Sequence, residues 1–191
     1  MTVCCVELEV PTALTNILVS HHIIFLQETT ETNFYLLKSI CLHYNMTLIY
    51  KTKKSSTMIV INYQHITFQN SNTLKSIRQS YCFTDAVIKI NGLKKSIHLV
   101  SVYYPITSET DNQLIVNNAL RQLPRSHHII LGGDFNHILD PELDAVKTVS
   151  QSAPKQAVTH ESESFYNDYN LVDVFRVRHP TTKSYTSRNT N

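Results

Sequence analysis

The chain has 191 residues and a formal net charge of +2 at neutral pH, with 42% hydrophobic and 17% charged residues. This composition excludes a disordered chain and predicts a single globular domain over residues 1–191 with a substantial core. The charge is too mild to establish nucleic-acid binding by itself, although it leaves room for a local basic patch.

Cysteine usage and hydropathy indicate an intracellular protein. The four cysteines show neither CxxC spacing nor the density of a disulfide framework, which favours reduced thiols. No apolar run approaches the length that spans a membrane. The first residues carry Glu7 and Glu9 and no basic segment, unlike a secretory signal. We therefore expect a protein of the cytoplasm or nucleus with no membrane partner.

The N-terminal third predicts alternating helices and strands. Pro11 opens a segment whose apolar residues recur as on one face of a helix. Residues 29, 30 and 32 are threonines, which offer N-caps to a second helix with an apolar stripe. This alternation implies layered α/β packing. Short strands are expected at 23–26, 47–50, 58–61 and 66–68, while residues 3–6 stay open between a strand and irregular structure.

A polar, basic loop separates two of these strands. It runs from Lys51 to Ser56 and contains three lysines. Such a loop could contact a phosphate backbone. The favoured alternative is an ordinary solvated turn.

The middle of the chain predicts a β-hairpin. Residues 82–90 and 96–103 are rich in β-branched and aromatic side chains, and Asn91-Gly92 between them is a strong hairpin signal. Antiparallel strands are therefore expected, in a sheet that is not purely parallel.

The C-terminal third predicts a helix, a buried strand and then mostly polar chain. The helix begins near Ser108 or Asp111 and ends before Pro124. Asp173 and Arg176 are expected to contact each other or to form a helix cap. A short helix is expected over 165–170, and a further strand is expected to begin within 181–186.

The segment around Asp134 organises the chain. An apolar run at 129–131 is typical of a strand buried on both faces. Gly132 and Gly133 follow it and let another group approach the backbone closely. Asp134 and Asn136 then project at the carboxyl end of the strand, where open α/β sheets usually bind ligands. The alternative is an ordinary strand followed by a Gly-Gly turn.

A second apolar run repeats this pattern. Glu28 lies six residues after His22, as Asp134 lies six residues after His128. Side chains alternate along a strand, so the even offset gives both acids the same facing relative to their runs. Two such strands could place Glu28 and Asp134 on one rim, where Mg²⁺ takes one or two carboxylates and keeps several waters. Coincidence between two hydrophobic runs is the alternative.

An ordered set of motifs relates the chain to a known superfamily. The motifs are Leu26-Gln27-Glu28-Thr29, Val102-Tyr103-Tyr104-Pro105, Gly132-Gly133-Asp134-Phe135-Asn136, Asp173-Val174-Phe175-Arg176, His179-Pro180 and Tyr185-Thr186. In this order and spacing the chain resembles the endonuclease/exonuclease/phosphatase superfamily. It is most similar to the apurinic/apyrimidinic-type endonuclease domain of LINE-type (non-LTR) retrotransposons, over most of residues 12–187.

The resemblance implies a fold and a reaction. The fold is a DNase I-like, four-layer α/β sandwich, with two mixed β-sheets face to face and helices outside. The reaction is phosphodiester hydrolysis with Mg²⁺ or Mn²⁺, as in the nicking of target DNA by a retrotransposon. The resemblance also implies a reverse transcriptase domain further along the parent polypeptide.

The resemblance assigns roles to four residues. Glu28 matches the metal-binding glutamate, and Tyr103 matches the active-site tyrosine near the scissile phosphate. Asp134 matches the aspartate that orients or activates the attacking water. Asn136 matches the amide that holds a phosphate oxygen.

The chain also departs from the superfamily pattern. The first strand of the family carries a metal-binding asparagine, but residues 2–10 contain none. Ile106 and Ser187 stand where asparagine and tryptophan are usual. The chain reaches Asn191 without the C-terminal Ser-Asp-His motif, so we expect a domain that lacks its final strands. The alternative to an active endonuclease is therefore a catalytically inactive, truncated remnant with at most nucleic-acid binding.

Overall fold

A computed structural model describes residues 3–7, 11–63, 65–71, 82–104, 118–136, 143 and 167–183. The chain divides into two compact units, residues 1–135 and 136–191, which are described separately. The expectation of one domain stays a prediction.

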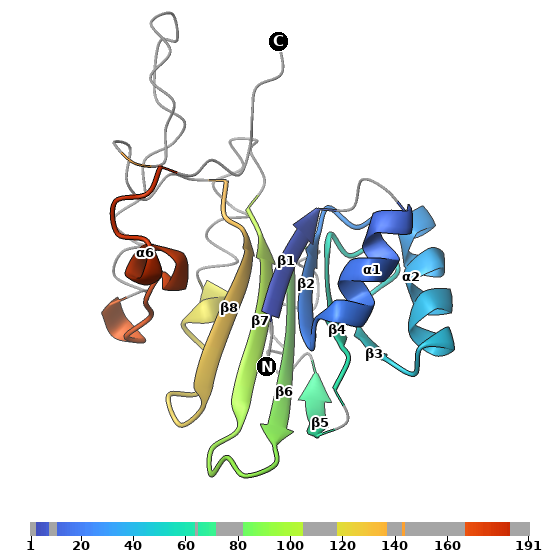
Figure 1. Cartoon of the computed structure of the whole chain (residues 1–191). Coiled ribbons are helices and arrows are strands. Elements are labelled where there is room, and N and C mark those ends of the chain that lie inside the picture. The colour runs from blue at the N-terminus through green and yellow to red at the C-terminus, as the bar shows by residue number, and fades with distance from the viewer. Residues whose placement is uncertain are drawn as a thin grey trace, which may run out of the picture. The chain divides into compact units, whose positions relative to one another are not determined.

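The elements of the first unit are β1 (Val3–Glu7), α1 (Pro11–Ser20), β2 (Ile23–Gln27), α2 (Glu31–His43), β3 (Thr47–Ile49), β4 (Thr57–Ile61), β5 (Ile66–Ser71), β6 (Phe83–Ile90), β7 (Ile97–Tyr103) and β8 (His128–Asp134) (Figure 1).

The first unit contains two four-stranded sheets, and both are mixed. Sheet A has the order β1-β2-β4-β3, in which β1 and β2 are parallel and β4 is antiparallel to both of its neighbours. Sheet B has the order β5-β6-β7-β8, in which only β7 and β8 are parallel. The expected strands are confirmed within a few residues, and the hairpin turns at Gly92 with a φ of +89°. β5 runs further than expected, to Ser71, through a register shift after Phe68.

The two sheets and the first two helices form three layers. Helices α1 and α2 lie against one face of sheet A (Figure 1), and sheet B packs on the other face. The core between the helices and sheet A consists of Leu14, Leu18, Ile24, Leu26, Phe34, Leu37, Cys41, Met58 and Val60. The core between the sheets consists of Ile23, Phe25, Ile49, Ile59, Ile61, Ala86, Ile88, Ile97 and Leu99.

The helix expected before Pro124 is described only in part. Residues 118–120 are helical, and Ala119, Leu120 and Leu123 are buried. Residues 105–117, where the rest of that helix is expected, lie outside the described residues. None of the helices in the described ranges is long and apolar enough to cross a membrane.

Four polar side chains lie buried between the sheets at one end of the sandwich. They are Gln27, Thr57, Thr84 and Ser101, each at most 2% exposed. Gln27 pairs with Thr57 within sheet A, and Thr84 pairs with Ser101 within sheet B. Across the sheets, Gln27 Nε2 donates to Ser101 Oγ at 3.2 Å, and the hydroxyls of Thr57 and Thr84 bond at 2.9 Å. We call this closed set of four residues the polar layer.

A buried ionisable pair lies elsewhere on sheet B. His98 Nε2 is 3.0 Å from Asp85 Oδ2, and both side chains are fully buried. Asp85 alternates along β6 with Thr84 and Ala86, which face sheet A, so the pair lies on the other face of sheet B. Mutual pairing offsets part of the cost of removing these groups from water.

The second unit contains helix α6 (Val174–Arg178). The side chain of Asp173 caps this helix by accepting a hydrogen bond from the Arg176 backbone N–H at 3.0 Å, which confirms the expected cap. Residues 167–168 are helical, within the short helix expected there. Residues 181–183 belong to no strand, so the strand expected from 181 does not begin there, and residues 184–186 lie outside the described residues.

Gly133 allows β7 and β8 to approach each other closely. Gly133 pairs with Val102 in the parallel register of these strands. A Cβ atom on Gly133 would collide with the Val102 carbonyl oxygen and would stand 2.7 Å from Val102 Cγ2. The group that approaches the glycine backbone is therefore the neighbouring strand.

We predict that Gly133→Ala destabilises the protein by roughly 3 kcal/mol, because the new methyl group overpacks against rigid backbone. The control is Gly92→Ala at the hairpin, where a Cβ meets nothing within 4 Å. That change costs only backbone strain, about 1 kcal/mol. Urea denaturation measures both. Equal losses of stability in the two variants would contradict the close approach at Gly133.

Candidate active site

Three of the four predicted site residues meet at the end of the first unit where the polar layer lies. Tyr103 ends β7, Asp134 ends β8, and the two residues pair in register. The Tyr104 backbone N–H donates to the Asp134 carbonyl oxygen at 2.9 Å. Glu28 directly follows β2 of the other sheet, and Tyr103 donates from its hydroxyl to Glu28 Oε1 at 2.9 Å. This hydrogen bond joins the ends of the two sheets in addition to the bonds of the polar layer.

The backbone of Glu28 turns its side chain toward sheet B. Ile24 and Leu26, which alternate with Glu28, pack against the helices, whereas Ile130, which alternates with Asp134, packs between the sheets. The two apolar runs therefore face different layers of the sandwich, and the equal spacing does not by itself bring the two acids together. Glu28 has a φ of +52°, in the left-handed backbone region that residues other than glycine rarely adopt. This turn brings its carboxylate to Tyr103 instead of to the helices.

The surroundings of Tyr103 keep its phenol protonated. Burial raises the pKa of Tyr103 to about 12, and the hydrogen bond to Glu28 and the negative charges of Glu28 and Asp134 act in the same direction. The phenol therefore remains a neutral hydrogen-bond donor throughout the neutral range. Two acidic residues, Glu28 and Asp134, thus neighbour this phenol at the rim.

The donor set fits a hard divalent cation that keeps much of its water. Glu28 is exposed and accepts a hydrogen bond from Tyr103 at Oε1, so its carboxylate could hold a cation from solvent. Among the residues that the structure describes, no three His, Cys, Asp or Glu side chains form a ready metal cluster. Mg²⁺ is commonly bound through one or two carboxylates with several waters. The two acidic residues at the rim favour a cation there.

Asn136 lies two residues beyond Asp134, at the start of the second compact unit. Its φ is +46°, so it shares the left-handed conformation of Glu28. Asparagine adopts this conformation more readily than most residues, and Asn45 and Asn170 also have a positive φ. The structure does not test the role of Asn136 toward a phosphate, which stays a prediction.

The segment after Glu28 is fixed by contacts that the sequence did not reveal. Thr29 is buried, its N–H donates to the Ser56 carbonyl at 3.2 Å, and its hydroxyl donates to the Ser55 carbonyl. Thr30 is the N-cap of α2 and accepts a hydrogen bond from the Asn33 N–H at 3.3 Å. The run of threonines signalled the cap, but nothing local signalled the bonds to Ser55 and Ser56.

Comparison with sequence families gives a direct match. The model of the Endonuclease/Exonuclease/phosphatase family matches residues 9–148. This range contains Glu28, Tyr103, Asp134 and Asn136. No curated protein matches the chain at a significant level.

Several solved structures share the fold. An AP endonuclease from Archaeoglobus fulgidus is 14% identical with a TM-score of 0.65, over 100% of this chain and 79% of that chain. The endonuclease domain of TRAS1, a telomere-specific non-LTR retrotransposon, is 14% identical with a TM-score of 0.55, over 87% and 69%. D. rerio TDP2 complexed with single-strand DNA product is 17% identical with a TM-score of 0.53, over 70% and 55%.

These likenesses establish the fold, two mixed sheets with helices in a DNase I-like α/β arrangement, as expected from the sequence. The chain spans 55% of the D. rerio TDP2 chain and 60% of its humanised variant. At such low identities and coverages the similarity concerns architecture alone.

We predict that the phenol of Tyr103 titrates near pH 12 and that Glu28→Gln moves its pKa down toward the ordinary value of 10. The substitution removes one of the two charges and weakens the acceptor, while burial remains. Ultraviolet absorbance of the phenolate during alkaline titration measures this, and the difference from Tyr103→Phe identifies the one phenol. A Tyr103 pKa that is unchanged in Glu28→Gln would contradict the observed pair.

Proposed function

Because the chain belongs to the endonuclease/exonuclease/phosphatase family, we propose that it hydrolyses phosphodiester bonds of DNA with Mg²⁺ or Mn²⁺. The observation that carries the proposal is the hydrogen bond of 2.9 Å between Tyr103 and Glu28, which joins the two sheet ends beside Asp134. One rim would then hold a carboxylate that binds the metal, a second carboxylate that positions the attacking water, and a neutral hydrogen-bond donor for a phosphate oxygen.

Each residue has a task in this proposal. Glu28 would hold the metal, which offsets negative charge on the phosphoryl and leaving oxygens when bound. Asp134 would orient a water molecule for in-line attack and accept its proton. The Tyr103 hydroxyl has a single hydrogen to donate; it donates it to Glu28 in this structure and could donate it to a phosphate oxygen instead. Asn136 would hold a phosphate oxygen through its amide.

The types of these side chains suit an anionic substrate. A phosphodiester repels nucleophiles because it already carries a negative charge, so uncompensated carboxylates at the rim would repel it too. Neutral donors stabilise charge that develops on the phosphate without adding a counterion of their own. The high pKa of Tyr103 keeps it in this neutral state.

The biological role that we propose is nicking of target DNA by a retrotransposon. The order of motifs supports this, together with a fold shared with the TRAS1 endonuclease domain. The proposal includes a reverse transcriptase domain in the parent polypeptide and action inside the cell, in the nucleus or cytoplasm.

We expect the purified chain to nick supercoiled plasmid with Mg²⁺ or Mn²⁺. Asp134→Asn should lower the rate at least about 100-fold, because proton transfer alone contributes roughly 10²–10⁴-fold. Glu28→Ala should lower the rate by at least as much, because it removes the side chain that would hold the metal. EDTA should abolish nicking. Agarose-gel conversion of supercoiled to open-circular plasmid measures the rate.

Lys94→Gln, at the opposite end of sheet B, is the control and should nick at the wild-type rate. Nicking that survives EDTA would rule out the metal. The absence of nicking by a folded chain with either metal would favour the alternative function, a catalytically inactive domain with at most nucleic-acid binding.

A further inference from the structure

A basic loop is anchored directly beside the candidate active site. This lysine loop (Lys51–Ser56) leads into β4, whose first residue pairs with the last residue of β2. Thr29, the residue after Glu28, donates to the carbonyls of Ser55 and Ser56 through its hydroxyl and its N–H. The loop and the candidate metal ligand are therefore held at the same end of the sandwich.

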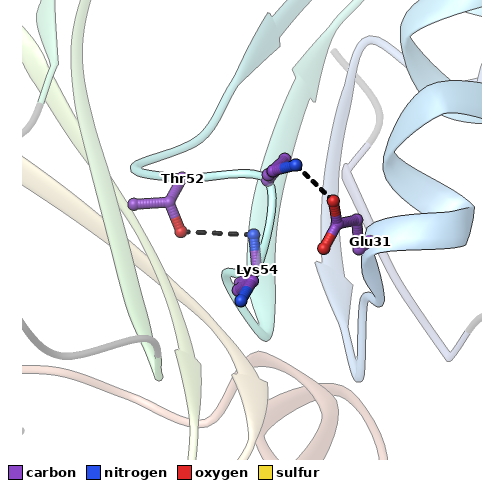
Figure 2. A network of polar contacts seen from close by, with 4 residues as sticks. Glu31, Thr52 and Lys54 are labelled. Carbon is purple, nitrogen blue, oxygen red and sulfur yellow. Dashed lines mark hydrogen bonds and ion pairs between the residues drawn. The ribbon is translucent and has the colours of Figure 1, made fainter.

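The lysine loop is an organised turn. Ser55 is fully buried, and its N–H donates to the Thr52 carbonyl at 3.0 Å while its hydroxyl accepts from the Thr52 N–H at 3.0 Å. The Lys54 N–H donates to the Thr52 hydroxyl at 3.2 Å, as Figure 2 shows. These bonds fix the backbone from which the lysine side chains project.

The three lysines of the loop have different surroundings. Lys51 is half-buried, with its Nζ 4.7 Å from the centroid of the Phe83 ring, and burial lowers its pKa to about 8. Lys54 is exposed. The Lys53 side chain is 49% exposed and its Nζ pairs with the Glu31 carboxylate, which is 40% exposed (Figure 2). The solvent-facing cations of the loop are thus Lys53 and Lys54.

We propose that Lys53 and Lys54 bind backbone phosphates of the DNA strand that enters the site, and that Glu31 competes with a phosphate for Lys53. This inference rests on the proposed function and names its substrate contact. A solvent-exposed ion pair is weak, so a phosphate can replace the carboxylate as the partner of Lys53. Lysine binds phosphate as a point charge, which fits contact with the backbone and not with base edges.

The fold supplies a matched control for charge. Lys94 and Lys95 are exposed in the turn between β6 and β7. That turn lies at the end of β7 opposite Tyr103, roughly 20 Å away at about 3.3 Å per residue. Removing a charge there changes the net charge of the protein equally without touching the proposed contact.

The test is fluorescence anisotropy of a labelled 20-base-pair DNA duplex with the full chain in EDTA, from 50 to 300 mM NaCl. EDTA prevents metal-dependent cleavage, so binding is measured apart from hydrolysis. Lys53→Gln and Lys54→Gln should each weaken binding several-fold and reduce the slope of log K against log[salt] by about 0.9, the loss of one phosphate contact. Lys94→Gln and Lys95→Gln should keep the wild-type slope.

Glu31→Gln is expected to change DNA affinity in the opposite direction to the lysine substitutions. It should tighten binding, because it frees Lys53 and removes a charge that repels phosphate. Weaker binding by Glu31→Gln, with circular dichroism unchanged, would overturn the competition.

The lysine-loop contact and the hydrolysis proposal fail in different ways. If the Lys53 and Lys54 variants match the Lys94 and Lys95 variants, the loop contact is overturned, even where plasmid nicking continues. If their slopes fall as expected but the wild type nicks no plasmid, the contact holds and hydrolysis fails. If the wild type does not bind the duplex, the contact is overturned.

Discussion

The candidate site depends on the polar layer, the four buried side chains that tie one end of sheet A to the same end of sheet B. A buried hydroxyl or amide without a partner costs about 1–3 kcal/mol, so these groups must face one another when the sheets pack. Gln27 directly precedes Glu28, and Ser101 lies two residues before Tyr103. The bond of 3.2 Å between Gln27 and Ser101 therefore sets how far apart the two halves of the site lie. An apolar layer at this position would lack these directional hydrogen bonds between the sheets.

Two backbone features then convert the strand ends into a site. Gly133 lets β8 approach β7 so closely that a side chain there would collide with Val102, which places Asp134 beside Tyr103. Glu28 adopts a φ of +52°, at a cost of roughly 1–3 kcal/mol for a residue in a sparsely populated region. The bond to Tyr103 and the anchoring of Thr29 offset part of this cost. The site is thus held by surrounding structure and not by the local preference of its residues.

Much of this architecture could be predicted from the sequence. Hydrophobic periodicity predicted the strands, and Asn91-Gly92 predicted the hairpin. The two apolar runs that end in acids predicted that Glu28 and Asp134 lie at one rim. The facing of Glu28 could not be predicted, because alternation is a local rule and the two runs face different layers. The hydrogen bond between Gln27 and Ser101 spans 74 residues of sequence, and the hydrogen bond of Thr29 to Ser55 spans 26. Such contacts exist only once the sheets have packed.

The most direct test of the account is whether Glu28 holds a cation at the rim beside Asp134, and electron paramagnetic resonance of Mn²⁺ measures this without any substrate. The account predicts one bound Mn²⁺ that Mg²⁺ displaces, with affinity at least about tenfold weaker in Glu28→Gln. Asp134→Asn removes only a neighbouring charge and should weaken Mn²⁺ binding less than Glu28→Gln does. Wild-type affinity in Glu28→Gln, or no Mn²⁺ bound by the folded wild-type chain, would contradict the account.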